Sequence, residues 1–591
     1  MGKSTLNSIR LIVGVAVLAA TAAMAQAPSV SGEPALAPKA AVAAPQLRLG
    51  VGAAQSVVVL SPITDSELAT LREVNRRMQK RFAIGVVRKL EEGTPLPSGA
   101  DLSWTAVGGG FAAQLALRSP DAGSMRLSFD LAGVPDSIEM VFFGSDDPGR
   151  LVGPVRVGEI KDRGIAWWSP LTDGDTQTVE FFAPGTLGSG AMSLRVAGAS
   201  HVFTTIASRF EKTTQDIGTS GSCNVDIKCS PLLSSQAFLD MRNSVAQMLL
   251  TDVFQGFTAL CTGQLLNDTD STTQIPWFYS ANHCFENETL PDKTAAQMQT
   301  VASTLNTFWF FEAVSCRTPS DQTIPHYLQK FDGATYLYNN PGADSLFLRL
   351  NSAPPAGAFF AGWDANAVPV GSQIVVVHHP SGDLKKVSQG SVIRYSSPQP
   401  PIPSGASSTF SEVQYTSGTT EGGSSGSGLF TFDGSQYRLR GALYGGGAAC
   451  DAITDSDWYS QFDKVYPSLA QYLGATDYSD LWWNPNESGW GLNIVQHASR
   501  NIFAVWFTYG ADGKPAWYVI PGGTWTSATT FTASMYSTSG PAASEATFDQ
   551  SRVKKTRVGT ATLTFSDASN ATFAYTVNGV SGTKSITRQP Y

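Results

Sequence analysis

The strongest chemical signal in the sequence is a serine set among glycines, in the run Gly-Ser-Ser-Gly-Ser at 423–427. A nucleophilic serine needs a tight turn that exposes its hydroxyl and aims backbone N–H groups at one point. Glycines around Ser425 permit such a turn. We therefore expect Ser425 to be a nucleophile, with the N–H groups of Gly423 and Ser425 stabilising an oxyanion. Because the chain has other Gly/Ser loops, such as 404–407, this run alone does not decide the chemistry.

A histidine suited to act as general base lies upstream. His283 follows the apolar run Trp-Phe-Tyr-Ser-Ala-Asn at 277–282 and is itself followed by Cys284. A general base must be held rigidly, and a disulfide at the next residue would hold it. The rival is the pair His378 and His379, which has no neighbouring cysteine. His283 is the better candidate for the base.

The carboxylate of such a site is expected at Asp344. A general base needs an acidic partner that fixes its tautomer and stabilises the imidazolium. Asp344 stands at the entry to the apolar run 346–350, where it can be buried beside the histidine, and Asp332 is a structural rival. The order His, Asp, Ser is that of chymotrypsin and differs from those of subtilisin and the α/β-hydrolases. The separations suit a His and Asp from one β-barrel and a Ser from the next.

The composition indicates a β-rich chain of several domains. Its 591 residues are too many for one hydrophobic core. Only 15% of them are charged, and 56 are glycine, which favours sheets with many turns. The net charge of -8 comes with no basic stripe, so we expect no nucleic-acid partner.

The first 25 residues have the pattern of an export signal. Lys3 and Arg10 precede an apolar run from 11 to 23, and Ala-Met-Ala at 23–25 supplies the small residues that signal peptidase needs. The run is shorter than the roughly 20 residues that span a bilayer, and no later segment is long and apolar enough. We expect a signal peptide at 1–25, no membrane span, and a secreted, extracellular protein.

Changes of pattern divide the rest of the chain into three parts. Residues 26–217 start with an Ala/Pro-rich leader, expected to be flexible to about 46, followed by an amphipathic helix within 64–82 and β-sandwich-like alternation. Residues 218–474 contain all six cysteines, an even number that predicts three disulfides in an exported protein. Residues 477–591 form a Trp-rich β domain, whose indoles are either core or a ligand-binding platform.

The ordered motifs resemble the secreted bacterial lysyl endopeptidases within the trypsin-like proteases. The resemblance covers residues 80–470 and includes Ser-Gly-Ser-Cys-Asn-Val-Asp at 220–226, Thr-Glu-Gly-Gly-Ser-Ser-Gly-Ser at 420–427 and Trp-Ser-Pro at 168–170. It implies a mainly β fold: a chymotrypsin-like double β-barrel at 218–474, a preceding β-rich propeptide and a small accessory domain. It also implies a serine-type endopeptidase that acts on protein or peptide substrates after basic residues, without cofactor or metal.

The resemblance further implies how the cysteines pair. The implied disulfides are Cys223–Cys450, Cys229–Cys316 and Cys261–Cys284.

The resemblance also guides the search for a substrate pocket. Thr419 stands six residues before the nucleophile, where trypsin has the aspartate that binds the basic side chain of the substrate, so this chain lacks that pocket aspartate. The resembling endopeptidases take the carboxylate from the loop after the last cysteine. Asp457 is the best match there, with Asp451 and Asp455 as rivals. We expect Asp457 to bind the basic side chain of the substrate.

A second pocket position differs from the family. Tyr444 stands where the family has a histidine, and the sequence offers no clear counterpart of the family's tryptophan. A single buried aspartate attracts Lys and Arg alike unless geometry excludes the planar guanidinium. The sequence therefore leaves the choice between Lys and Arg open.

Activation must differ from that of trypsin. The residue before the nucleophile is Ser424 and not an aspartate, so it cannot pair with a newly freed N-terminus. We expect the propeptide at 26–217 to assist folding and to block the site. The junction is expected at Ile217–Gly218, with self-cleavage after Arg209 or Lys212 as the alternative.

Other functions stay open at this point. They are a binding protein on an inactive protease fold, an esterase that uses the same triad, and an endopeptidase with a non-basic preference. All three triad positions are filled, which argues against the inactive fold.

Overall fold

The computed structural model describes most of the chain in separate stretches. They are residues 28–36, 44–52, 54, 56–75, 80–90, 102–161, 166–185, 193–205, 220–269, 274–286, 292–316, 327–397, 410–474, 478–496, 501–526, 529–542, 544–545, 547–566 and 569–589. The expected signal peptide and the candidate junctions at 209, 212 and 217–218 lie outside them. Within these stretches, no helix is both long and apolar enough to cross a membrane.

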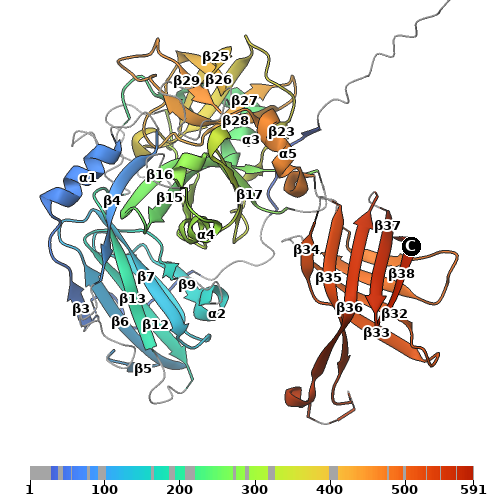
Figure 1. The fold of residues 1–591 in the computed structure, drawn as a ribbon. Helices are drawn as coiled ribbons and strands as arrows, with labels where there is room; N and C mark the ends of the chain where they lie inside the picture. Colours follow the sequence, from blue (N-terminus) through green and yellow to red (C-terminus); the bar gives the residue numbers. More distant parts are fainter. Residues whose placement is uncertain are drawn as a thin grey trace, which may run out of the picture.

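The first barrel of the cysteine-bearing domain is built on a buried hairpin. Its spatial order is β19-β18-β15-β16-β17-β21-β20. The bounds are β15 Val245–Asp252, β16 Phe257–Leu266, β17 Trp277–Ser280, β18 Asn306–Trp309, β19 Leu328–Lys330, β20 Ala334–Asn340 and β21 Ser345–Leu350. Every residue of β15 and β16 is buried. Helix α4, Ala295–Ser303, lies against β20 and β15 (Figure 1).

The second barrel closes on itself. Pairing runs from β24 to β25, β26, β29, β28, β27 and back to β24. The bounds are β24 Gln373–His378, β25 Lys386–Ser396, β26 Phe410–Ser417, β27 Gly428–Phe432, β28 Tyr437–Gly446 and β29 Asp457–Tyr459. Helix α5, Phe462–Leu473, buries its apolar face in the core that both barrels share. The expected double β-barrel is therefore present.

The region before the barrels is a sandwich of two sheets around an apolar core. Its first sheet has the order β3-β6-β12-β8-β9, with β5 at the edge of β6. The bounds are β3 Ser56–Val59, β5 Thr105–Val107, β6 Gly110–Arg118, β8 Glu139–Gly144, β9 Val152–Arg156 and β12 Thr176–Pro184. Helix α1, Asp65–Asn75, packs on this region where an amphipathic helix was expected.

The second sheet of the sandwich continues into the first barrel. It contains β4 Phe82–Lys89, β7 Ser124–Gly133 and β13 Ser193–Val202, with the two-residue strands β10 Trp167–Trp168 and β11 Thr172–Asp173 on β7. Strand β4 pairs on one side with β13 and on the other with β16. One sheet thus runs from the sandwich into the first barrel.

The leader differs from the flexible segment expected from its composition. Residues Ser29–Val30 form β1 and pair with β23, Gly362–Asp364, while Glu33–Pro34 form β2 and pair with β22, Phe359–Phe360. Backbone pairing with β23, which extends the sheet of the second barrel, and with the short strand β22 therefore holds residues 29–34. An Ala/Pro-rich composition carries no periodicity from which such pairing could be read.

Three disulfides join the six cysteines. They are Cys223–Cys450, Cys229–Cys316 and Cys261–Cys284, the same pairs that the resemblance implies. The first links the start of the enzyme domain to the loop before β29.

The C-terminal domain is one nine-stranded antiparallel sheet with its own core. Its strands are β30 Asp480–Trp483, β31 Gly491–Gln496, β32 Ile502–Tyr509, β33 Pro515–Ile520, β34 Gly523–Trp525, β35 Thr530–Ser539, β36 Lys554–Phe565, β37 Asn570–Val577 and β38 Val580–Arg588. Trp482 and Trp506 are buried in that core, whereas Trp517 is 51% exposed. Most indoles therefore serve packing.

The separate core generates a prediction about truncation. A chain ending after Gly474 keeps both barrels and α5, so we expect it to fold and to hydrolyse small peptides within about twofold of the full-length rate. Steady-state kinetics on matched preparations measure this. A truncated enzyme that folds by circular dichroism yet loses turnover would mean that the C-terminal domain reaches the catalytic cleft.

Candidate active site

Strands β17 and β21 bring His283 and Asp344 together. His283 lies in a single 3-10 turn, Asn282–Cys284, just after β17. Asp344 lies between the turn Pro341–Ala343 and the start of β21, in a left-handed backbone conformation with φ 43°. Because β17 and β21 pair antiparallel, with Ser280 opposite Leu346, the end of one strand lies beside the start of the other. Both side chains are buried.

The third residue comes from the second barrel. Ser425 lies in the loop between β26 and β27, where Gly423 and Gly426 have φ values of +90° and +80°. A Cβ on Gly426 would lie 2.1 Å from Ser280 Oγ and 2.5 Å from the Thr262 carbonyl oxygen. Only glycine fits so close to the first barrel, so this residue allows the loop to dock there.

The three side chains form one chain of hydrogen bonds. The Oγ of Ser425 lies 2.6 Å from Nε2 of His283, and Nδ1 of His283 lies 2.8 Å from Oδ2 of Asp344. The other carboxylate oxygen of Asp344 accepts a bond from the backbone N–H of His283 at 2.9 Å. This geometry can transfer a proton from the serine to the imidazole while the carboxylate fixes the ring.

Two backbone N–H groups converge on the carbonyl oxygen of a residue that shortly precedes strand β4. The N–H groups of Gly423 and Ser425 donate to the carbonyl oxygen of Lys80, at 2.5 and 3.2 Å. These are the two donors that the sequence predicted for an oxyanion. A substrate carbonyl polarised there would be next to the serine hydroxyl.

The side chain of Lys80 enters a buried pocket that ends at Asp457. Its ammonium donates to both carboxylate oxygens of Asp457, at 2.7 and 2.8 Å, and to the carbonyl oxygens of Thr420 and Ala448, at 3.0 and 2.8 Å. The hydroxyl of Thr420 accepts a further bond at 2.6 Å. All five of these hydrogen bonds end on oxygen atoms. The ammonium of Lys80 is therefore held by oxygen acceptors from Asp457, Thr420 and Ala448.

Neighbouring hydroxyl groups hold Asp457 in place. Tyr415 Oη donates to Asp457 Oδ2 at 3.0 Å, the Thr420 hydroxyl donates to the same oxygen, and the backbone N–H of Ala448 donates to Oδ1 at 3.3 Å. Burial raises the pKa of Tyr415 well above its usual value, so this phenol stays a neutral donor. The rivals Asp451 and Asp455 are exposed, and only Asp457 faces the pocket.

Tyr444 lies beside His283. Its ring meets the His283 ring edge-on, with centroids 5.7 Å apart, and contacts Phe410 at the same distance. Trp458 packs against Phe410 and Tyr444 and donates its indole N–H to Ser396 Oγ at 2.8 Å. Trp458 directly follows Asp457 in the sequence. Only the pairing of β29 with β26 and β28 brings it there.

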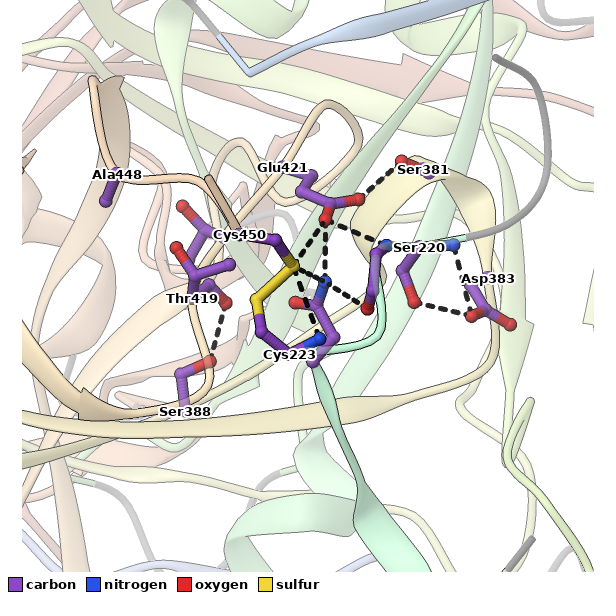
Figure 2. Close-up of a disulfide and its surroundings, with 12 residues drawn as sticks. Ser220, Cys223, Ser381, Asp383, Ser388, Thr419, Glu421, Ala448 and Cys450 are labelled. Carbon is purple, nitrogen blue, oxygen red and sulfur yellow. Dashed lines mark hydrogen bonds between the residues drawn. A yellow bond between two sulfur atoms is a disulfide. The ribbon is translucent and has the colours of Figure 1, made fainter. Parts of the chain in front are cut away.

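The loop before Ser425 is anchored to the first residues of the enzyme domain (Figure 2). Glu421 accepts bonds from the N–H of Gly221 at 2.9 Å, from Asn224 Nδ2 at 2.7 Å and from Ser381 Oγ at 2.8 Å, next to the Cys223–Cys450 disulfide. On the other side of this cluster, Ser220 Oγ donates to Asp383 at 2.6 Å. The contacts tie the start of the domain to the nucleophile loop.

Ser424 takes part in a neutral buried contact. Its hydroxyl lies 2.8 Å from Nδ1 of His378, and Nε2 of His378 lies 3.0 Å from Ser388 Oγ. Burial lowers the pKa of His378 to about 3, so the ring is neutral at ordinary pH. This imidazole, the rival of His283 in the sequence, is therefore a packing element. Ser424 stands where trypsin has an aspartate that pairs with the new N-terminus, and here the neutral His378 ring is its partner.

Comparison with known proteins gives the family. Residues 59–203 match the lysyl endopeptidase N-terminal domain, and residues 217–460 match the lysyl endopeptidase C-terminal domain. A lysyl endopeptidase of Pseudomonas aeruginosa is 33% identical over 353 residues, which are 59% of this chain and 71% of that protein.

Solved structures give weaker likenesses. The active form of an M. tuberculosis protease is 16% identical with a TM-score of 0.28, covering 44% of this chain and 93% of that one. The protease Anisep from Arthrobacter nicotinovorans is 15% identical with a TM-score of 0.26, covering 39% and 94%. At these values neither adds to what the chain's own topology shows.

The identity to the Pseudomonas protein extends over more than two thirds of that relative, and the two family matches occupy the region before the barrels and the double barrel. The chain belongs to the lysyl endopeptidase family and is a serine-type endopeptidase.

Proposed function

We propose that this chain is the precursor of a secreted endopeptidase that cleaves peptide bonds after lysine. The observation that carries the proposal is the placing of a lysine ammonium on Asp457 while the carbonyl of the same residue meets two N–H groups beside Ser425. A binding protein on an inactive fold has no need for this alignment of nucleophile, base and carbonyl. The signal-peptide pattern of residues 1–25 and the three disulfides support secretion.

The mechanism assigns one role to each group. Ser425 attacks the carbonyl carbon of the substrate lysine while His283 takes the hydroxyl proton on Nε2, and Asp344 stabilises the imidazolium. The N–H groups of Gly423 and Ser425 stabilise the oxyanion, each contributing about 3 kcal/mol by analogy with measured donors. His283 then gives the proton to the leaving amine, and water releases the acyl group by the same route.

Pocket geometry favours lysine over arginine. The ammonium is a compact cation whose three hydrogens match acceptors on several sides, whereas a guanidinium is planar and presents its donors in a fork. Here the carboxylate of Asp457 and the carbonyl oxygens of Thr420 and Ala448 surround a single nitrogen. An arginine would place its wider head where those acceptors already close the pocket.

The propeptide is proposed to act as an inhibitor. Residue Lys80 fills the pocket, and strand β4 covers the adjoining edge of β16. A substrate cannot bind until both are displaced.

The first test concerns the nucleophile. Ser425→Ala should lower peptide hydrolysis by at least about 10⁴-fold, because the covalent step is lost. Ser424→Ala is the matched control. Its hydroxyl serves His378, so it should lose roughly 1–3 kcal/mol of unfolding free energy and keep most activity. Hydrolysis of a lysyl amide and labelling by an organophosphonate measure both variants, and an inactive Ser424→Ala with an active Ser425→Ala would move the nucleophile by one residue.

The second test concerns the pocket. Asp457→Asn removes the buried negative charge, so kcat/KM for lysyl substrates should fall by about 10²–10³-fold or more. Asp455→Asn, at the exposed rival, should change it less than about twofold. Profiling cleavage on a peptide library gives both numbers. A wild-type enzyme that prefers large apolar residues, or a pocket variant that keeps full activity, would contradict the assignment.

A further inference from the structure

The segment around Lys80 is bound in the way a substrate would be bound. Its carbonyl oxygen lies between the N–H groups of Gly423 and Ser425, and its side chain ends on Asp457. The Lys80–Arg81 peptide bond therefore lies at the catalytic serine. This position is far from the junction expected near residue 217.

The residues after this bond also follow the path of a substrate. Arg81 donates from Nη1 to the carbonyl oxygen of Glu286 at 3.1 Å, in the loop that follows His283. Phe82 is opposite Leu260 in the pairing of β4 with β16. Its ring covers Gly422, where an added Cβ would lie 3.0 Å from Phe82 Cδ2. The chain leaves the serine as an extended strand on the first barrel.

A side chain bridges the two sides of the bond. Asn75, the last residue of α1, donates from Nδ2 to the carbonyl oxygen of Ala83 at 2.8 Å and accepts from the N–H of Ala83 at 2.8 Å. Asn75 precedes the bond and Ala83 follows it, so this pair ties the chain before the bond to the chain after it. Both ends would remain close together after cleavage.

We propose that the precursor cuts its own Lys80–Arg81 bond within the same molecule, and that the nicked propeptide stays on the enzyme as an inhibitor. This inference rests on the proposed lysyl endopeptidase function. It adds an internal cleavage site to the junction that separates propeptide and enzyme.

The step is ordinary peptide hydrolysis. Ser425 Oγ forms an ester with the Lys80 carbonyl carbon while its proton passes to His283. The C–N bond to Arg81 breaks, and the new amine of Arg81 takes that proton. Water then hydrolyses the ester and leaves Lys80 with a free carboxylate. No other reactant is required.

Retention follows from the contacts on both sides of the bond. Lys80 keeps its ion pair with Asp457, and β4 keeps its pairing with β13 and β16. The bridge from Asn75 to Ala83 joins the two fragments in addition to the fold of the sandwich. Because the Lys80 and Arg81 ends are held close together, re-forming the peptide bond competes with release of the N-terminal fragment. The first cut therefore activates the enzyme only slowly.

The experiment follows the purified precursor by intact mass and N-terminal sequencing. We expect a new chain that starts Arg81-Phe82, formed at a first-order rate that does not change over a hundredfold range of protein concentration. The Ser425→Ala precursor should remain whole at this bond, as should Lys80→Ala. The matched control is Lys161→Ala, whose ammonium pairs with Asp136 inside the propeptide, and it should be cut normally.

A second readout reports occupancy of the pocket. A lysyl organophosphonate should label Ser425 at least about tenfold faster in the Lys80→Ala precursor than in the Lys161→Ala precursor, because the pocket is open. Asn75→Ala should be cut at the same bond and should lose the fragment 26–80 faster on size-exclusion chromatography. Circular dichroism checks that each variant is folded.

Some outcomes would overturn the inference. They are an intact Lys80–Arg81 bond in the wild-type precursor, a rate that rises in proportion to concentration, or equal labelling of the two lysine variants. The mature enzyme is assayed on lysyl peptides in parallel. If it is active while the precursor bond stays intact, only the internal site fails, whereas a mature enzyme inactive on lysyl peptides would remove the proposed function itself.

Discussion

Three hydrogen bonds from strand β16 to the loop of Ser425 set how the two barrels meet, and the site depends on them. Thr262 donates its backbone N–H to the Ser425 carbonyl oxygen at 2.8 Å and its hydroxyl to the Gly423 carbonyl oxygen at 2.9 Å. Gln264 donates to the Gly426 carbonyl oxygen at 3.2 Å. Each bond contributes only about 1 kcal/mol to stability. Their larger effect is positional, because a displacement of about 1 Å between nucleophile and base costs about 10²-fold in rate.

The pocket anion illustrates a second constraint. Asp457 has no exposed surface, and two hydroxyl groups and one N–H group point at its carboxylate. A buried charge that loses its partner is costly, on the order of 3–5 kcal/mol. A cation of the right shape that pairs with Asp457 therefore removes this free-energy cost. In the structure, the ammonium of Lys80 supplies this positive charge.

How much the sequence could reveal differs between local and distant features. Ser425, His283 and Asp344, which hydrogen bonds join in the structure, could be selected from the sequence because each stands in a short motif and their order along the chain is informative. Asp457 was separable from Asp451 and Asp455 only by a resemblance, since all three stand in one loop. The structure distinguishes them by burial, which pattern alone does not give.

Other features depended on contacts between distant segments. Lys80 is one of several basic residues before the barrels, and the sequence around it does not indicate that its side chain contacts Asp457, 377 positions away. The pairing of β1 with β23 and of β4 with β16 likewise joins segments far apart, with registers that no local periodicity encodes. The packing of Trp458 was not predictable for the same reason, because its neighbours Phe410 and Tyr444 come from other strands.

The pairing of β4 with β16 has a consequence for what the mature enzyme can digest. Once β4 leaves, the stretch Phe257–Leu260 offers unpaired backbone groups at the edge of the first barrel. A polypeptide gains those bonds only by lying along the edge as an additional strand. Helices and the inner strands of stable sheets already use their own backbone groups, so they cannot do so without unfolding. The enzyme should therefore attack compact proteins at their loops and frayed ends and leave most of their interior lysyl bonds untouched until the target opens.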